Sequence, residues 1–317
     1  MLDAKQISDR LKRENSIALF CHIRPDGDTL GSALALKKAL VKKGVRAEVF
    51  CDDVIPEKFF FNPTFSEVKN CDPVGFSAYA AIDCADVTRL GRFSELFSGG
   101  KNTYNIDHHV SNTRYAEYNF VIDTAANCEN AFNLINELNV DIDENIANLL
   151  ATGIITDTGG FQHKNVTADT LLIASELVKK GADLNNITYN VFKKQRKERA
   201  KLFGKVMSSI RYFADGRLAV ATVLYDDFLS TGAFKDETEG FIDFVMGIDC
   251  VEVGVCVMET ERNKFKCSFR SKGTNVNEIA SVFGGGGHVL ASGCQINGDY
   301  EEVVDKLRYA VISHLPE

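Results

Sequence analysis

The sequence has no excess of basic residues. Its 317 residues include 36 Lys and Arg against 44 Asp and Glu, which gives a formal net charge of −8. This balance excludes a broad basic surface that grips long nucleic acid. It remains compatible with a small basic pocket for a short phosphorylated ligand.

The sequence also lacks closely spaced cysteine pairs and long apolar runs. Nine scattered cysteines without CxxC spacing argue against a structural zinc site and are typical of reduced, buried thiols. No apolar run approaches the roughly 20 residues that cross a bilayer. The N-terminal residues 1–16 are typical of a polar amphipathic helix rather than a signal peptide. We therefore expect a soluble, cytoplasmic protein.

What the first half does contain is an alternation of strand and helix patterns. Strands are predicted near 16–23, 45–51, 79–86, 102–109 and 117–123, and helices over 29–44, 125–139, 143–154 and 167–180. This alternation predicts an α/β fold with a doubly wound, mainly parallel sheet.

The second half shows a basic stretch and hairpin signals instead of alternating strands and helices. A basic stretch over 186–206 predicts one long helix, in which we interpret the run "KKQRKERAK" as a solvated face. Two hairpins are predicted after it, one at the Asp215-Gly216 pair and one around residues 261–263. We therefore expect a first domain over 1–188, a helical linker over 189–207 and a smaller mixed-sheet α+β domain over 208–317.

Acidic and histidine residues occur in four clusters. Three clusters directly follow predicted strands, whose carboxyl ends meet at one edge of a parallel sheet. The clusters consist of His22, Asp26 and Asp28; Asp83; Asp107, His108 and His109; and Asp157. A lone Asp here could be only a turn or cap residue.

Taken together, these carboxylates need positive charge nearby to offset their mutual repulsion. Burying so many of them side by side would cost several kcal/mol through repulsion and desolvation. Divalent cations remove that cost, and mixed Asp and His ligands without thiolates suit Mn²⁺ or Mg²⁺. The sequence therefore predicts a two-metal site.

The motifs that carry these residues are "HIRPDGDTLGS", "AIDCAD", "IDHHVSN" and "TGIITDTGGF", and a glycine-rich "FGGGGHVLASG" follows at 283–293. In this order they resemble the DHH phosphoesterase superfamily with its associated C-terminal domain. The resemblance covers essentially the whole chain and is strongest to the nanoRNase and pAp-phosphatase (NrnA-like) group. That group degrades very short oligoribonucleotides and removes the 3′-phosphate of pAp.

The resemblance implies a role for each matching residue. His22 and Asp26 would hold one metal, with Asp28, His108 and Asp157 on the other and Asp83 bridging both. His109 would face the substrate phosphate, and Asp107 would orient the motif. Two Mn²⁺ ions per chain are expected, with Mg²⁺ as the alternative. Metals held in this way activate a water for hydrolysis.

The resemblance implies that the substrate-binding residues lie in the second domain. Consecutive glycines let backbone N–H groups approach an anion. The residues expected to contact substrate there are Arg270, Ser271, Gly284, Gly285, Gly286, Gly287 and His288. For Arg270 the alternative role is a surface salt bridge. The expected partners are short oligoribonucleotides or small phosphorylated nucleotides, with no long nucleic acid and no membrane, and a homodimer is left open.

Other functions stay open at this point. A phosphodiesterase of cyclic dinucleotides, or of their linear products, would use the same site. A RecJ-like exonuclease is disfavoured by the acidity of the chain, and a pyrophosphatase by "GGGGH". A catalytically inactive nucleotide-binding regulator is disfavoured because every expected metal-ligand position carries a suitable residue. Arg24 stands where the family pattern leads us to expect Asn, which bears on substrate preference.

Overall fold

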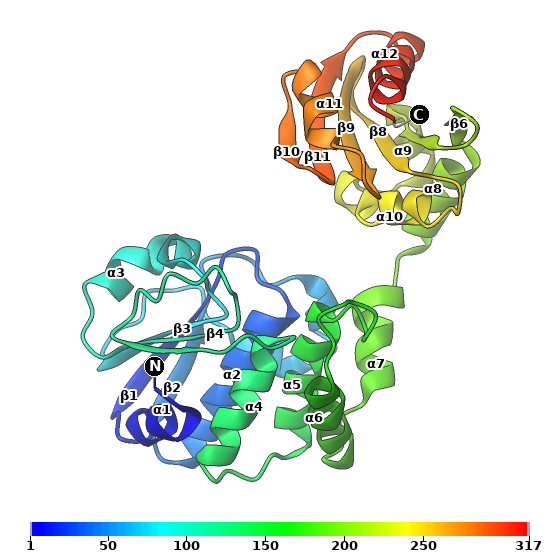
Figure 1. Ribbon diagram of the computed structural model, residues 1–317. Helices are drawn as coiled ribbons and strands as arrows, with labels where there is room; N and C mark the ends of the chain where they lie inside the picture. Colours follow the sequence, from blue (N-terminus) through cyan, green and yellow to red (C-terminus); the bar gives the residue numbers. More distant parts are fainter. Residues whose placement is uncertain (1, 316–317) are drawn as a thin grey trace. The chain divides into compact units, whose positions relative to one another are not determined.

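The structure is a computed structural model that describes residues 2–315. The chain divides into two compact units, unit 1 over residues 1–194 and unit 2 over residues 195–317 (Figure 1). None of the helices within residues 2–315 combines the length and the apolar character that membrane crossing requires.

Unit 1 contains a five-stranded, wholly parallel sheet in the order β2-β1-β3-β4-β5. Its strands are β1 (Ser16–Cys21), β2 (Arg46–Phe50), β3 (Ala78–Ile82), β4 (Thr103–Asp107) and β5 (Tyr118–Val121). Every residue of β1 is buried, as expected for a central strand covered on both faces. The predicted α/β class is confirmed.

Helices cover both faces of this sheet. The α-helices of unit 1 are α1 (Ala4–Leu11), α2 (Gly27–Lys42), α3 (Ser94–Ser98), α4 (Asn127–Glu137), α5 (Glu144–Asp157), α6 (Ala168–Lys179) and α7 (Leu184–Thr188). The short 3-10 helices are η1 (Glu57–Phe59), η2 (Pro63–Glu67) and η3 (Val87–Phe93). On one face, α1, α2, α4 and α5 share a core with the strands, and η3 and α3 pack against the other face.

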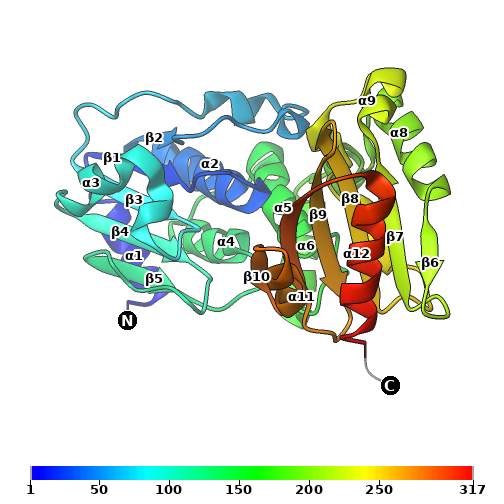
Figure 2. The ribbon, with the colours of Figure 1, turned by 90° about the horizontal axis from the view of Figure 1, so that it is seen from above.

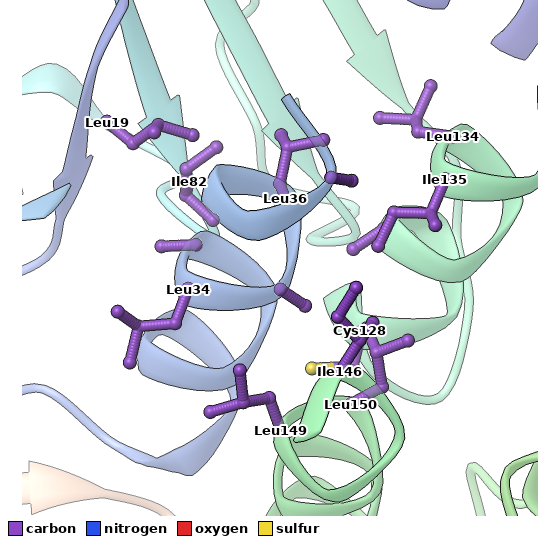
Figure 3. Close-up of a cluster of buried hydrophobic side chains, with 14 of the residues drawn as sticks. Leu19, Leu34, Leu36, Ile82, Cys128, Leu134, Ile135, Ile146, Leu149 and Leu150 are labelled. Atoms are coloured by element: carbon purple, nitrogen blue, oxygen red, sulfur yellow. The ribbon is translucent and has the colours of Figure 1, made fainter. Parts of the chain in front are cut away.

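The contact between α2 and its neighbours forms the centre of unit 1. Figure 3 shows α2, which carries Leu34 and Leu36, between strand residues such as Ile82 and the apolar side chains of α4 and α5. Gly31 of α2 lies so close to the Leu149 carbonyl of α5 that a Cβ would overlap it. This close approach fixes the first turn of α2, which carries Asp28, against α5, which carries Asp157.

Unit 2 contains a mixed six-stranded sheet in the order β10-β11-β9-β8-β7-β6. The strands are β6 (Arg211–Phe213), β7 (Leu218–Val223), β8 (Val253–Glu261), β9 (Lys264–Ser271), β10 (Gly286–His288) and β11 (Ala291–Asn297). Both predicted hairpins are present, as β6–β7 and β8–β9, whereas β7 and β8 run parallel.

The two faces of this sheet differ. The helices are α8 (Lys197–Ser208), α9 (Tyr225–Thr231), α10 (Phe241–Met246), α11 (Val276–Val282) and α12 (Tyr300–Ile312), with a 3-10 turn η5 (Lys235–Thr238). One face is covered by α11 and α12 (Figure 2). On the other face, α8, α9 and α10 pack on β7 and β8. There the side chains of β9 stay accessible, with Lys266 exposed and Ser268 and Arg270 half-buried.

The single long helix predicted over 186–206 is wrong. The chain forms α7, then a π-helical turn η4 (Tyr189–Lys193), and α8 begins only at Lys197. Lys194 has an extended backbone, with φ −65° and ψ 123°, which ends the helical run. Leu202 and Val206 of α8 are buried in unit 2, so the second part of the predicted linker packs within that unit.

Candidate functional site

Three neighbouring strands of unit 1 bring polar side chains to the carboxyl edge of the sheet. His22 directly follows β1, Asp83 directly follows β3, and Asp107 ends β4. Because β1, β3 and β4 are adjacent and parallel, their ends lie side by side. Asp83 turns out of its strand with a left-handed φ of 56°, which is uncommon for a residue other than glycine.

Two helices supply the remaining carboxylates. Asp26 is the N-cap of α2, and its side chain accepts from the backbone N–H groups of Asp28 and Thr29. Asp28 is fully buried, and its two oxygens accept from the backbone N–H groups of Asn127 and Cys128 at the start of α4. Asp157 is the last residue of α5.

These side chains form groups with spacing suited to a cation. His22 Nε2 lies 3.6 Å from Asp26 Oδ2 and 3.5 Å from Asp83 Oδ2. His108 Nε2 lies 3.9 Å from Asp28 Oδ2, 3.4 Å from Asp83 Oδ1 and 3.4 Å from Asp157 Oδ2. One ligand group thus contains His22, Asp26 and Asp83, and another contains Asp28, His108 and Asp157.

Backbone carbonyls orient both buried imidazoles. His22 Nδ1 lies 2.9 Å from the Ile23 carbonyl oxygen, and His108 Nδ1 lies 2.9 Å from that of Thr124. A carbonyl can only accept, so each Nδ1 carries the proton and each Nε2 is directed at the carboxylates. This is the tautomer in which histidine binds a metal through Nε2.

The pKa values of several residues in these two ligand groups are shifted. Burial, followed by repulsion from Asp28 and Asp83, raises the pKa of Asp157 to about 9. Burial and the charge of Asp83 likewise raise the pKa of Asp28 to about 7. Burial would lower the pKa of His22, but hydrogen bonds to Asp26 and Asp83 raise it to about 10. Burial is thus the main cause of the raised pKa of the two carboxyls, and the neighbouring negative charges add to it and raise the pKa of His22.

Asp83 Oδ1 provides a direct indication of a missing partner. This oxygen is buried and has no hydrogen-bond donor within residues 2–315. An unpaired buried carboxylate oxygen is costly, and coordination to a cation would satisfy it. The donor set of Asp and His oxygens and nitrogens therefore fits divalent cations at this site.

His109 differs from the other two histidines. Its side chain is 35% exposed, against 3% for His22 and 12% for His108. Its Nδ1 lies 2.8 Å from Asp107 Oδ1, and Asp107 is buried and also accepts from Asn112 Nδ2. The pKa of His109 is raised, chiefly by the hydrogen bond to Asp107. Its Nε2 is left for a group outside the protein.

In unit 2, strand pairing aligns the predicted substrate contacts. His288 pairs with Ala291, and Ala291 pairs with Arg270, so the three side chains share one face of the sheet. Arg270 lines a cavity of about 330 Å³ together with Lys235, Lys266 and Ser268.

Ser271 and the glycines behave differently from Arg270. Ser271 alternates to the opposite face, and its Oγ accepts from the Gly273 N–H. The N–H groups of Gly284, Gly285 and Gly287 donate to acceptors within the protein. Gly285 lies against the backbone of Gly293, where a Cβ would overlap. Gly287 likewise lies against Ala291 and Ser292, so Gly285 and Gly287 permit close packing on β11, whereas a Cβ on Gly284 or Gly286 would meet no overlap.

Several residues that complete the site escaped the motif analysis. Asn112 lies inside the quoted motif "IDHHVSN", so its place beside Asp107 was readable from the sequence. The N–H groups of Asn127 and Cys128, which hold Asp28, lie about a hundred residues along the chain and give no local signal. Arg89, whose Nη2 lies 3.1 Å from His22 Nδ1, was also missed.

Comparison with known proteins gives a consistent result. Residues 16–154 match the DHH family, N-terminal domain, and residues 215–315 match the DHHA1 domain. The bifunctional oligoribonuclease and PAP phosphatase NrnA of Thermus thermophilus is 32% identical over 308 residues, covering 93% of this chain and 90% of the relative. The Bacillus subtilis protein of the same name is 27% identical, covering 89% and 90%.

A solved structure is similar over nearly the whole length. The crystal structure of an exopolyphosphatase-related protein from Bacteroides fragilis superposes with a TM-score of 0.83 at 25% identity, covering 98% of this chain and 95% of that one. With both domain matches and the relatives in agreement, this chain belongs to the DHH phosphoesterase family that carries a DHHA1 domain, and over most of its length it is similar to NrnA proteins.

Proposed function

We propose that this protein hydrolyses short oligoribonucleotides to mononucleotides and dephosphorylates pAp-like bisphosphorylated nucleotides. The observation that carries this proposal is the pair of adjacent ligand groups at the edge of the parallel sheet, in which Asp83 belongs to the His22 group and lies 3.4 Å from His108 of the other. Its relatives named as oligoribonuclease and PAP phosphatase support the choice of substrate.

In this proposal, Asp83 would help to hold both of two cations. His22 and Asp26 would hold one cation, and the second would be held by Asp28, His108 and Asp157. Histidine among carboxylates favours Mn²⁺ over Mg²⁺. When bound, such ions lower the pKa of a water and neutralise charge on phosphate oxygens.

The chain's own residues then orient the substrate. His109 is partly exposed and is fixed through Nδ1 by Asp107, so it offers Nε2 to a phosphate oxygen. Asp107 supports the imidazolium form of His109, which can donate a hydrogen bond to an anion or a proton to a leaving oxygen. Asn112 in turn holds Asp107.

We further propose a division of labour between the domains. The segment 1–188 would carry the metals, 189–207 would connect, and 208–317 would hold the nucleotide through Arg270 and His288. Their shared face supports this role, as does the cavity beside Arg270, whose lining holds Lys235 and Lys266 together with Asp236 and Glu239. The nine free cysteines support a reducing, cytoplasmic location.

A substrate panel tests the proposed function. The purified chain is assayed with Mn²⁺, Mg²⁺ or EDTA on pAp, pApA, pGpG, cyclic di-AMP, a five-mer RNA and a fifty-mer RNA. We expect turnover of pAp and of the short RNAs that requires a divalent cation. We also expect rates that fall steeply for the long RNA, because an acidic chain offers few phosphate contacts.

Other outcomes of the same panel identify the alternatives. Preferred hydrolysis of cyclic di-AMP or pGpG would replace the oligoribonuclease assignment with a dinucleotide phosphodiesterase. Equal rates on the five-mer and the fifty-mer would indicate a RecJ-like exonuclease. Absence of turnover on every substrate, with both cations, would reject catalysis.

A further inference from the structure

Arg89 places a positively charged guanidinium beside His22, at the edge of the candidate metal site. It lies in η3, the 3-10 helix that follows Asp83. Its backbone carbonyl accepts from the Ile23 N–H at 2.8 Å, which ties η3 to the segment that carries His22. The side chain is half-buried, with Nη2 3.1 Å from His22 Nδ1.

The imidazole cannot satisfy this guanidinium. The Nδ1–H of His22 is already directed at the Ile23 carbonyl, so Nδ1 has no lone pair to offer Arg89. Among residues 2–315, no carboxylate lies within ion-pair distance of Arg89, and no oxygen accepts a hydrogen bond from its guanidinium. The N–H groups of its guanidinium are therefore available to donate hydrogen bonds to a ligand.

The next arginine of the same segment shows the contrast. Arg92 lies three residues further on, and its Nη1 is 3.0 Å from Asp52 Oδ1. Its Nη2 also donates to Asn70 Oδ1 at 2.7 Å. Arg92 is thus paired in the way that surface arginines commonly are, whereas Arg89 is held at the site edge without an acceptor.

The charge of the site favours an anion beside Arg89. Once cations occupy the two ligand groups, Asp26 and Asp83 are used as ligands, and the guanidinium faces a centre that is no longer negative. A guanidinium remains charged and presents parallel N–H donors that match two phosphate oxygens. A phosphate group bound at the metals would supply the missing acceptors.

We propose that Arg89 binds a phosphate oxygen of the substrate on the His22 side of the site. This inference rests on the proposed phosphoesterase function and adds a substrate-contacting residue to it. His109 approaches from the β4 end and Arg89 from the β1 end, so the two would grip the phosphate group from opposite sides of Asp83.

The test compares Arg89→Gln with Arg92→Gln in the full chain loaded with Mn²⁺. The dissociation constant of inorganic phosphate is measured by calorimetry, bound metal by elemental analysis, and kcat/KM on pAp. For Arg89→Gln we expect phosphate binding about 10- to 100-fold weaker, the loss typical of a charge-assisted hydrogen bond, with full metal content. Arg92→Gln should match the wild type in all three measurements.

A second variant separates charge from shape. Arg89→Lys keeps the charge but loses the fork, so its phosphate affinity should lie between those of the wild type and Arg89→Gln. Phosphate binding by Arg89→Gln equal to that of the wild type would overturn the inference. A loss of bound metal at unchanged phosphate affinity would overturn it as well, because Arg89 would then only position His22.

These outcomes are distinct from a failure of the proposed function. If the wild type hydrolyses none of the phosphate esters, the proposed function fails first. If the wild type is active and Arg89→Gln keeps its phosphate affinity and its kcat/KM, only the role of Arg89 is rejected.

Discussion

At the scale of single residues, Asp83 is the point where the two ligand groups meet. Its Oδ2 approaches His22 and its Oδ1 approaches His108, while Oδ1 is buried without a hydrogen-bond donor. Asp83→Asn should lower kcat by more than roughly 100-fold, because losing a ligand costs more than losing a residue that supports one. The measurement is steady-state turnover of pAp with saturating Mn²⁺.

The fold should survive this substitution. Replacing one carboxylate removes repulsion from Asp28 and Asp157, so the melting temperature without metal should be unchanged or higher. The stabilisation by Mn²⁺ should be lost. Turnover close to that of the wild type would contradict the bridging role of Asp83.

The two neighbouring histidines should respond differently to removal. His108 is mostly buried with Nε2 among three carboxylates, whereas His109 is partly exposed and bonded to Asp107. His108→Ala should lower the metal content, and His109→Ala should keep both metals but reduce kcat. Elemental analysis beside single-turnover rates decides this, and an equal metal loss in both variants would show that the assigned roles are wrong.

At the scale of elements, the close approach of α2 and α5 positions Asp28 and Asp157. A Cβ on Gly31 would overlap the Leu149 carbonyl, and backbone cannot move aside cheaply. Gly31→Ala should therefore lower the free energy of unfolding by roughly 1–3 kcal/mol and weaken Mn²⁺ binding as well. Urea denaturation and metal titration measure the two effects.

Gly204 of α8 provides a matched control. It also lies inside a helix, but a Cβ there would meet nothing within 4 Å. Gly204→Ala should raise the free energy of unfolding by about 0.5–1 kcal/mol, since alanine loses less backbone entropy in a helix. A similar loss in both variants would mean that the contact between α2 and α5 is not the cause.

At the scale of the whole molecule, the metal centre couples stability to pH. Without metal, the pKa values of His22 and His108 are raised to about 10 and those of Asp28 and Asp157 to about 7 and 9. The folded state thus holds more protons than the unfolded state once the pH exceeds about 4, where these two carboxyls of the unfolded chain lose their protons, and stability falls as pH rises from there.

The stabilisation by Mn²⁺ should grow over the same range. Metal ligands must release their protons to bind, so affinity increases with pH. Melting temperatures are measured between about pH 6 and pH 9, with EDTA and with Mn²⁺. The melting temperature in EDTA should fall with pH, and the difference between the two conditions should widen. A constant difference would contradict a role for these four groups as ligands.

The sequence determined most strands and helices of unit 1 and the inventory of candidate ligand residues. Runs such as 16–21 and 78–82 are short and apolar, and each is followed by His or Asp, which local pattern alone can reveal. Parallel order then predicts that these residues meet at one edge. The long helix over 186–206 was mispredicted because composition does not show that the backbone of Lys194 becomes extended.

Only the tertiary structure decided how the ligands are paired, oriented and held. The N–H groups that fix Asp28 come from the start of α4, and the carbonyl that fixes His108 comes from Thr124. Arg89 lies beside His22 although 67 residues separate them. Such contacts depend on how strands and helices pack rather than on any local pattern, and they determine which nitrogen carries a proton and which guanidinium lies beside it.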